Sequence, residues 1–139
     1  MINPPSPIKT VFVFPIHNEV EKGKSIYNAT RGLWNIPPIY HNLRPSYAVG
    51  LVKSLSVGSF EIERWILAVG FTNKYEFISP NHPNPSIYQP LSNEDWSNVL
   101  AQAMGFWQFG NYLIVEFDGN GHFRIARGNP DHITWHNCI

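Results

Sequence analysis

Short runs of β-branched and aromatic residues recur along this chain, and turn-forming residues separate them. Such residues favour strands, because branched and aromatic side chains pack well on a pleated surface. The runs predict strands over 10–16, 47–53, 58–68 and 74–78, and a hairpin over 112–127. The Asp-Gly and Asn-Gly pairs inside the last segment supply the positive φ that tight hairpin turns require.

Alternation within these runs predicts which side chains share a face. In the strand over 47–53, Tyr47, Val49 and Leu51 are expected on one face, and Gly50 is expected at a bulge or a close backbone approach. Phe60 and Ile62 are expected to be the buried residues of the strand over 58–68. In the hairpin, the apolar face is predicted to contain Leu113, Val115, Phe117, Phe123 and Ile125.

Two segments carry helix signals. Ser25 is placed to cap a short helix that runs through Arg31 and stops at Gly32. In the segment 91–107, apolar residues follow the i, i+3, i+4, i+7 spacing of an amphipathic helix. The polar segment 17–24 is predicted to be a loop.

The order of these elements predicts an α+β domain. We expect a curved antiparallel sheet or a small β-barrel with two helices. The 139 residues fit a single domain over 1–139, with the proline-rich segment 1–8 as a flexible lead-in.

The charge and composition of the chain indicate which kinds of partner it is expected to bind. Ten Lys and Arg residues balance ten Asp and Glu residues, so the formal net charge is zero. This balance argues against a non-specific grip on nucleic acid, which depends on excess positive charge, and it favours self-association into a homo-oligomer. No apolar run is long enough to span a membrane, and no signal-peptide pattern begins the chain. With one cysteine, Cys138, the chain is expected to be cytoplasmic and not bound to a membrane.

One stretch, 25–65, combines cations, aromatic side chains and adjacent strands. A guanidinium binds phosphate or carboxylate in a bidentate manner, and an indole offers a flat surface for stacking. The predicted ligand-binding residues are Tyr27, Arg31, Trp34, Arg44 and Trp65. The alternative is structural: Arg31 would pair with Glu61 or Glu63, and Trp34 would fill the core.

The histidines raise the question of a metal site or a catalytic base. His132 and His136 are four residues apart, a spacing that places two ligands on one face of a helix. A nearby proline and two β-branched residues disfavour a helix there, and no third ligand is evident. His17 and Glu19 could form an acid–base pair, but polar loop residues of this kind are usually only solvated. No catalytic residue, metal or cofactor is therefore predicted, and the chain is expected not to be an enzyme.

Five motifs spread along the chain resemble a pattern found in uncharacterised bacterial proteins. They are I-Y-N-A-T-R-G-L-W-N-I at 26–36, Y-A-V-G-L-V at 47–52, F-E-I-E-R-W at 60–65, G-F-W-Q-F-G at 105–110, and R-G-N-P with H-N-C within 127–138. In some of those proteins the pattern accompanies a GIY-YIG nuclease domain, whose strands and catalytic residues are absent from this chain. The resemblance implies a non-nuclease accessory module.

The strand pattern also looks like that of PUA-like barrels, a group that includes readers of modified bases and RNA. This similarity implies a small PUA-like β-barrel. Readers of that kind hold an unstacked base in an aromatic-lined pocket with few cations, which agrees with zero net charge.

Three functional hypotheses follow. The leading one is a small non-catalytic binding module that recognises nucleic acid or a modified base through a pocket of Trp and Arg residues. The second is a metal- or histidine-dependent hydrolase or nuclease that uses His17, His132 or His136. The third is an interaction or assembly subunit, favoured by zero charge and the 14% aromatic content.

Overall fold

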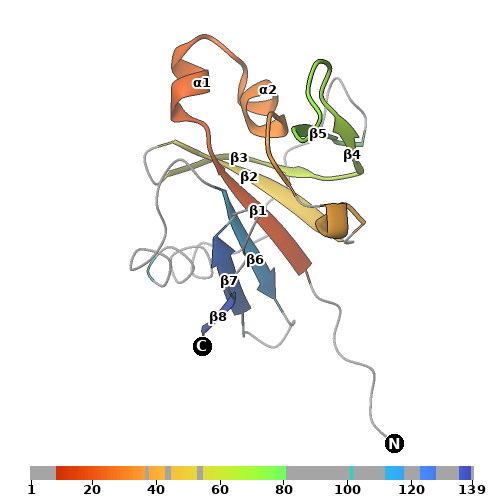
Figure 1. Ribbon diagram of the computed structural model, residues 1–139. Coiled ribbons are helices and arrows are strands. Elements are labelled where there is room, and N and C mark those ends of the chain that lie inside the picture. Colours follow the sequence, from red (N-terminus) through yellow and green to blue (C-terminus); the bar gives the residue numbers. More distant parts are fainter. Residues whose placement is uncertain are drawn as a thin grey trace, which may run out of the picture.

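The computed structural model contains a six-stranded sheet, a separate two-stranded sheet and short helices between β1 and β2 (Figure 1). The strands are β1 (Lys9–Pro15), β2 (Ser46–Val52), β3 (Leu55–Glu61), β4 (Arg64–Leu67), β5 (Tyr75–Ile78), β6 (Leu113–Phe117), β7 (Phe123–Arg127) and β8 (Trp135–Cys138). The helices are α1 (His17–Glu21), α2 (Ile26–Arg31) and the 3-10 turn η1 (Pro38–Tyr40). The structure describes residues 9–36, 38–42, 45–52, 55–80, 101, 112–117, 123–127 and 135–138. The larger sheet has the order β3-β2-β1-β6-β7-β8, and β4 pairs with β5.

Strand β1 lies inside the larger sheet, with β2 parallel on one side and β6 antiparallel on the other. Residues 10–14 of this strand are all buried. A strand that is covered on both faces needs a continuous apolar run of this kind, and the sequence T-V-F-V-F supplies it. Pro15 is the last residue of the strand. The predicted strand over 10–16 and its proline terminus are confirmed.

Alternation along β1 divides the core into two layers. Val11 and Val13 belong to one layer, together with Val49, Leu51, Leu113, Val115 and Ile125. Phe12 and Phe14 belong to the other, together with residues that include Tyr27, Ala29, Ala48, Phe60, Ile62 and Phe77. The predicted faces of β2 and the burial of Phe60 and Ile62 are confirmed. The predicted hairpin is also confirmed, since β6 and β7 pair with Val115 opposite Ile125; the side chain of Phe123 lies outside the described residues.

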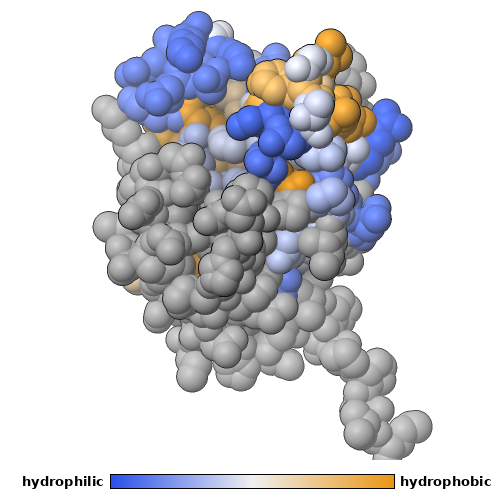
Figure 2. Space-filling view, viewed as in Figure 1, coloured by the Kyte–Doolittle hydropathy of each residue, from blue (hydrophilic) through white to orange (hydrophobic). Residues whose placement is uncertain are grey.

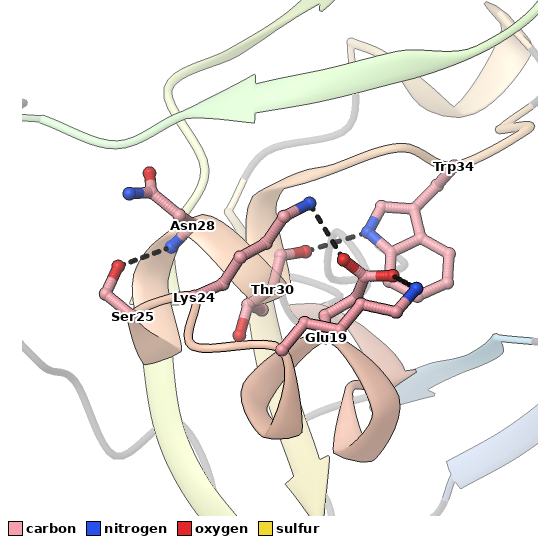
Figure 3. Close-up of polar contacts among 7 residues, drawn as sticks. Glu19, Lys24, Ser25, Asn28, Thr30 and Trp34 are labelled. Atoms are coloured by element: carbon pink, nitrogen blue, oxygen red, sulfur yellow. Dashed lines mark hydrogen bonds and ion pairs between the residues drawn. The ribbon is translucent and has the colours of Figure 1, made fainter.

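Helix α2 packs closely on the sheet because two glycines face it. Its N-cap is Ser25, whose hydroxyl accepts a hydrogen bond from the Asn28 amide at 3.2 Å (Figure 3). Gly50 of β2 lies opposite Gly58 of β3, so two neighbouring positions carry no side chain. An added Cβ at Gly50 would lie 2.5 Å from Thr30 Oγ1, and one at Gly58 would lie 2.7 Å from Ile26 Cγ2. The predicted helix and the close approach at Gly50 are both confirmed, and the register of β2 and β3 shifts between Gly50 and Leu51.

Three expectations about the fold are wrong. The segment 17–24 is not only a loop, because His17–Glu21 forms α1. The sheet is not purely antiparallel: the connection through α1, α2 and η1 returns the chain so that β2 runs parallel to β1. No closed barrel is formed by the described strands, since β3 and β8 stand at opposite ends of the sheet. The α+β class itself is confirmed.

The run over 58–68 is two strands in different sheets. The Ile62 amide donates to Ser46 O at 2.9 Å, and the next amide, Glu63, donates to Ile78 O at 2.8 Å. The chain therefore changes from the β2 side to β5 within two residues. The predicted strand over 74–78 is confirmed as β5, whereas β8 was not predicted. The predicted helix over 91–107 and the lead-in 1–8 lie outside the described residues, apart from Ala101.

Tyr112, which precedes β6, is expected to make the stability of the fold depend on pH. Its hydroxyl donates to Asn35 O at 2.8 Å, and burial, with a contribution from Tyr40, raises its pKa above the usual value of 10.0. Because the unfolded chain releases this proton at lower pH than the folded chain does, stability should fall as pH rises above about 10. Denaturant unfolding across this range should show that decline, and Tyr112→Phe should make it shallower. An unchanged slope in the variant would assign the decline to other groups.

Candidate functional site

Four of the five predicted ligand-binding residues lie around α2 and the β4–β5 pair, and Arg44 lies outside the described residues. Tyr27 is buried on α2, and its hydroxyl accepts a hydrogen bond from the Ser79 amide at 3.1 Å. Its ring packs edge-on against Phe60 and Phe77. Tyr27 therefore holds α2 against β3 and β5.

Arg31 is the last residue of α2, and its side chain is 16% exposed. Its guanidinium Nη2 lies 3.5 Å from Glu76 Oε1 on β5, and its Cζ lies over the Tyr27 ring, 5.6 Å from the centroid. The partner is thus Glu76, and not Glu61 or Glu63 as the structural alternative expected. The guanidinium Nε is buried and has no acceptor among the described residues.

Trp34 joins the end of α2 to β5. Its indole Nε1 donates to Thr30 O at 2.8 Å (Figure 3), and its backbone exchanges two hydrogen bonds with Tyr75 at 2.8 and 2.9 Å. The indole is stacked on Phe14, with centroids 4.3 Å apart and an interplanar angle of 18°. One face of Trp34 is therefore used by the core, as the structural alternative expected, although the side chain is only partly buried.

Trp65 of β4 lies opposite Phe77 of β5 and packs edge-on against Phe12, Phe14 and Phe77. The imidazole of His41 lies on Trp65, with centroids 5.8 Å apart and an interplanar angle of 24°. The Trp65 side chain is partly buried, and its Nε1 is buried without an acceptor among the described residues.

The two tryptophans belong to a group of four partly buried rings, which we call the ring group: Trp34, His41, Trp65 and Tyr75. His41 contacts Tyr75 edge-on at 4.4 Å and is oriented by a 2.9 Å hydrogen bond between its Nε2 and Ile36 O. Four separate segments supply the four rings. His41 and Tyr75 were not predicted, because nothing in their local sequence indicates that they meet the two tryptophans.

The ring group consists of flat side chains that are partly exposed, which suits stacking on a planar ligand. It contains no carboxylate. The acid–base pair of His17 and Glu19, which was considered from the sequence but not favoured, is not formed: His17 lies 3.1 Å from Glu21, and Glu19 pairs with Lys24 at 2.9 Å. The hydrogen bond and charge of Lys24, with the charge of Lys22, lower the pKa of the Glu19 carboxyl. That carboxyl is therefore held in its charged form on the exposed surface of α1.

The described residues contain no group of three His, Cys, Asp or Glu side chains that could hold a metal ion. His132 and the side chain of His136 lie outside them. Within the same residues, no helix is both long enough and apolar enough to cross a membrane.

Comparison with protein-family models, with curated proteins and with solved structures gave no match to this chain. The resemblance to the module that accompanies GIY-YIG nucleases therefore stays a prediction from the sequence. The similarity of the strand pattern to that of PUA-like proteins also stays a prediction, although the described strands do not close into a barrel.

Proposed function

We propose that this protein is a non-catalytic binding module that stacks an unpaired base of a single-stranded nucleic acid against the ring group. The observation that carries the proposal is the convergence of four partly exposed rings from separate segments, with His41 stacked on Trp65. Every base has a π-face, so such a surface binds bases with little regard to sequence.

Two donors without acceptors support this assignment. Trp65 Nε1 and Arg31 Nε are both buried and lack partners among the described residues. A buried donor without an acceptor lowers the stability of a folded protein by about 1–3 kcal/mol. A base supplies carbonyl and ring-nitrogen acceptors, so a small rearrangement on binding would recover part of that cost for either donor.

Arg31 was expected to bind the phosphate groups of the nucleic acid, but it is already paired with Glu76. Arg64, which is exposed at the start of β4, and Lys74, which precedes β5, take that role in the proposal. Arg44 remains a predicted phosphate contact. With few cations, the affinity should come mainly from stacking and should depend only weakly on salt.

Replacement of Trp65 or His41 tests the proposal. Trp65→Leu and His41→Ala should each weaken binding to a labelled single-stranded oligonucleotide about 5- to 150-fold, the range measured for loss of one stacking contact. Fluorescence anisotropy at low and at physiological ionic strength measures this change. His41→Ala removes no fully buried side chain, so it tests binding if Trp65→Leu proves unstable.

The matched control is Tyr47→Leu. Tyr47 is also a partly buried aromatic residue, but it packs on the opposite layer of the core, with Val49 and Leu51. Its replacement should leave the affinity unchanged. Absence of binding by the wild-type protein to single-stranded DNA and RNA at low salt would sink the proposal, as would equal losses in all three variants.

A further inference from the structure

The end of the β4–β5 hairpin exposes apolar side chains on a tight turn. Phe71 N donates to Ala68 O at 3.1 Å, and Gly70 has φ +85°, which together describe a type II turn. The exposed fractions are 51% for Leu67, 97% for Val69 and 41% for Phe71. We call these three residues the apex. Figure 2 shows hydrophobic surface over this end of the hairpin, apart from the hydrophilic surface over α1.

The apex is continuous with the ring group. Leu67 lies opposite Tyr75 in the hairpin, and Tyr75 is bridged in turn to Trp34. Residues two apart on a strand share a face, so Leu67 follows Trp65 on the same side of β4. A ligand that reaches the rings from this end of the hairpin therefore meets the apex as well.

The hairpin carries a cation on each side of its turn: Lys74 lies beside the apex, and Arg64 lies at the other end of β4, opposite Ile78. The nine residues 65–73 contain no charged side chain, and Arg64 and Lys74 stand immediately before and after them. Neither cation pairs with an acidic side chain among the described residues, whereas Glu76 further along β5 is paired with Arg31. Charge on the hairpin is therefore complementary to an anionic partner that also has an apolar interior.

We infer that the apex is a wedge that enters between base pairs of a DNA duplex and unstacks one step. Proteins that bind the minor groove open a base step by inserting apolar side chains of this kind. Arg64 and Lys74 bind the flanking phosphates, and the ring group receives the unstacked base. The inference rests on the proposed function, and it extends the substrate class from single strands to duplex DNA.

The test is a duplex that carries 2-aminopurine, whose fluorescence rises when the base leaves the stack. Wild-type protein should raise this fluorescence on binding. Val69→Ser combined with Phe71→Ser should abolish the rise and weaken duplex binding about 10- to 100-fold, while binding to single strands changes less than about twofold. Both side chains are exposed, so the fold should tolerate the change.

The control is Leu33→Ser. Leu33 has the same exposed fraction as Phe71, 41%, but lies beside α2 and not on the hairpin. It should keep the wild-type fluorescence rise and duplex affinity. Arg64→Gln should reduce the dependence of duplex affinity on salt by the equivalent of about one phosphate contact.

The outcomes separate the wedge from the ring site. If single strands bind and the apex variant still opens the duplex, the wedge is wrong and the proposed function stands. If no single strand binds, the proposed function fails, and the wedge fails with it. If the protein instead sediments with vesicles of anionic phospholipid, and the apex variant does not, the apex is a membrane contact and the wedge is overturned.

Discussion

Replacement of Phe14 by alanine is expected to lower the free energy of unfolding by about 3–5 kcal/mol, the usual cost of removing a large aromatic side chain from a packed core. Phe14 is fully buried in the middle of the larger sheet. Its ring stacks on Trp34 and contacts Phe12, Trp65 and Tyr112. The cavity left by the substitution would border both tryptophans of the ring group, so they would lose packing together.

Urea denaturation followed by far-UV circular dichroism measures the change. Phe71→Ala is the matched control, because this phenylalanine is 41% exposed at the apex and its loss should cost less than about 0.5 kcal/mol. If both variants lost the same small amount, Phe14 would not be the support of the ring group that its contacts indicate.

Replacement of Gly50 by alanine is expected to destabilise the protein by about 1–3 kcal/mol, although alanine is otherwise acceptable in a strand. The added methyl group would lie 2.5 Å from Thr30 Oγ1 and 2.7 Å from Ile16 Cδ1. The isoleucine can rotate the end of its side chain away. Thr30 cannot move easily, because its hydroxyl donates to Ile26 O at 2.7 Å and its carbonyl accepts from Trp34. Alanine would therefore lift α2 from the sheet.

A double-mutant cycle with Thr30→Ala isolates this contact. In the Thr30→Ala background the methyl group at position 50 has room, so Gly50→Ala should cost less there by about 0.5–3 kcal/mol. Thermal or urea unfolding of the four proteins gives the coupling. Additive losses would mean that Gly50 matters for a reason other than the approach of α2.

Elements governed by neighbouring residues were predictable from the sequence. The buried run of β1 can only be a strand covered on both faces, and the Ser25 hydroxyl with Gly32 marks both ends of α2. The alternation of Tyr47, Val49 and Leu51 against Ala48 assigns both faces of β2. In each case the information lies within a few residues of the element.

Features that depend on distant contacts were not predictable in this way. The parallel pairing of β1 with β2 depends on the direction that the chain takes through α1 and α2. Local sequence patterns do not determine that direction. The same limit applies to the site. Arg31 pairs with Glu76 because Gly32 lets the chain approach β5: a Cβ at Gly32 would lie 2.6 Å from Glu76 Cβ. The contacts of His41 with Trp65 and Tyr75 likewise arise only from the assembled fold.

The hydrogen bond from Trp34 to Thr30 O connects the end of α2 to the segment that follows it. A helix leaves its last carbonyl groups without intrahelical partners, and here an indole from beyond the helix satisfies one of them. The same residue forms the backbone bridge to Tyr75 and covers Phe14. Displacement of Trp34 would therefore fray the end of α2, detach the neighbouring backbone from β5 and uncover the aromatic layer at once. These three regions are therefore expected to lose their contacts together, because all of them depend on the position of Trp34.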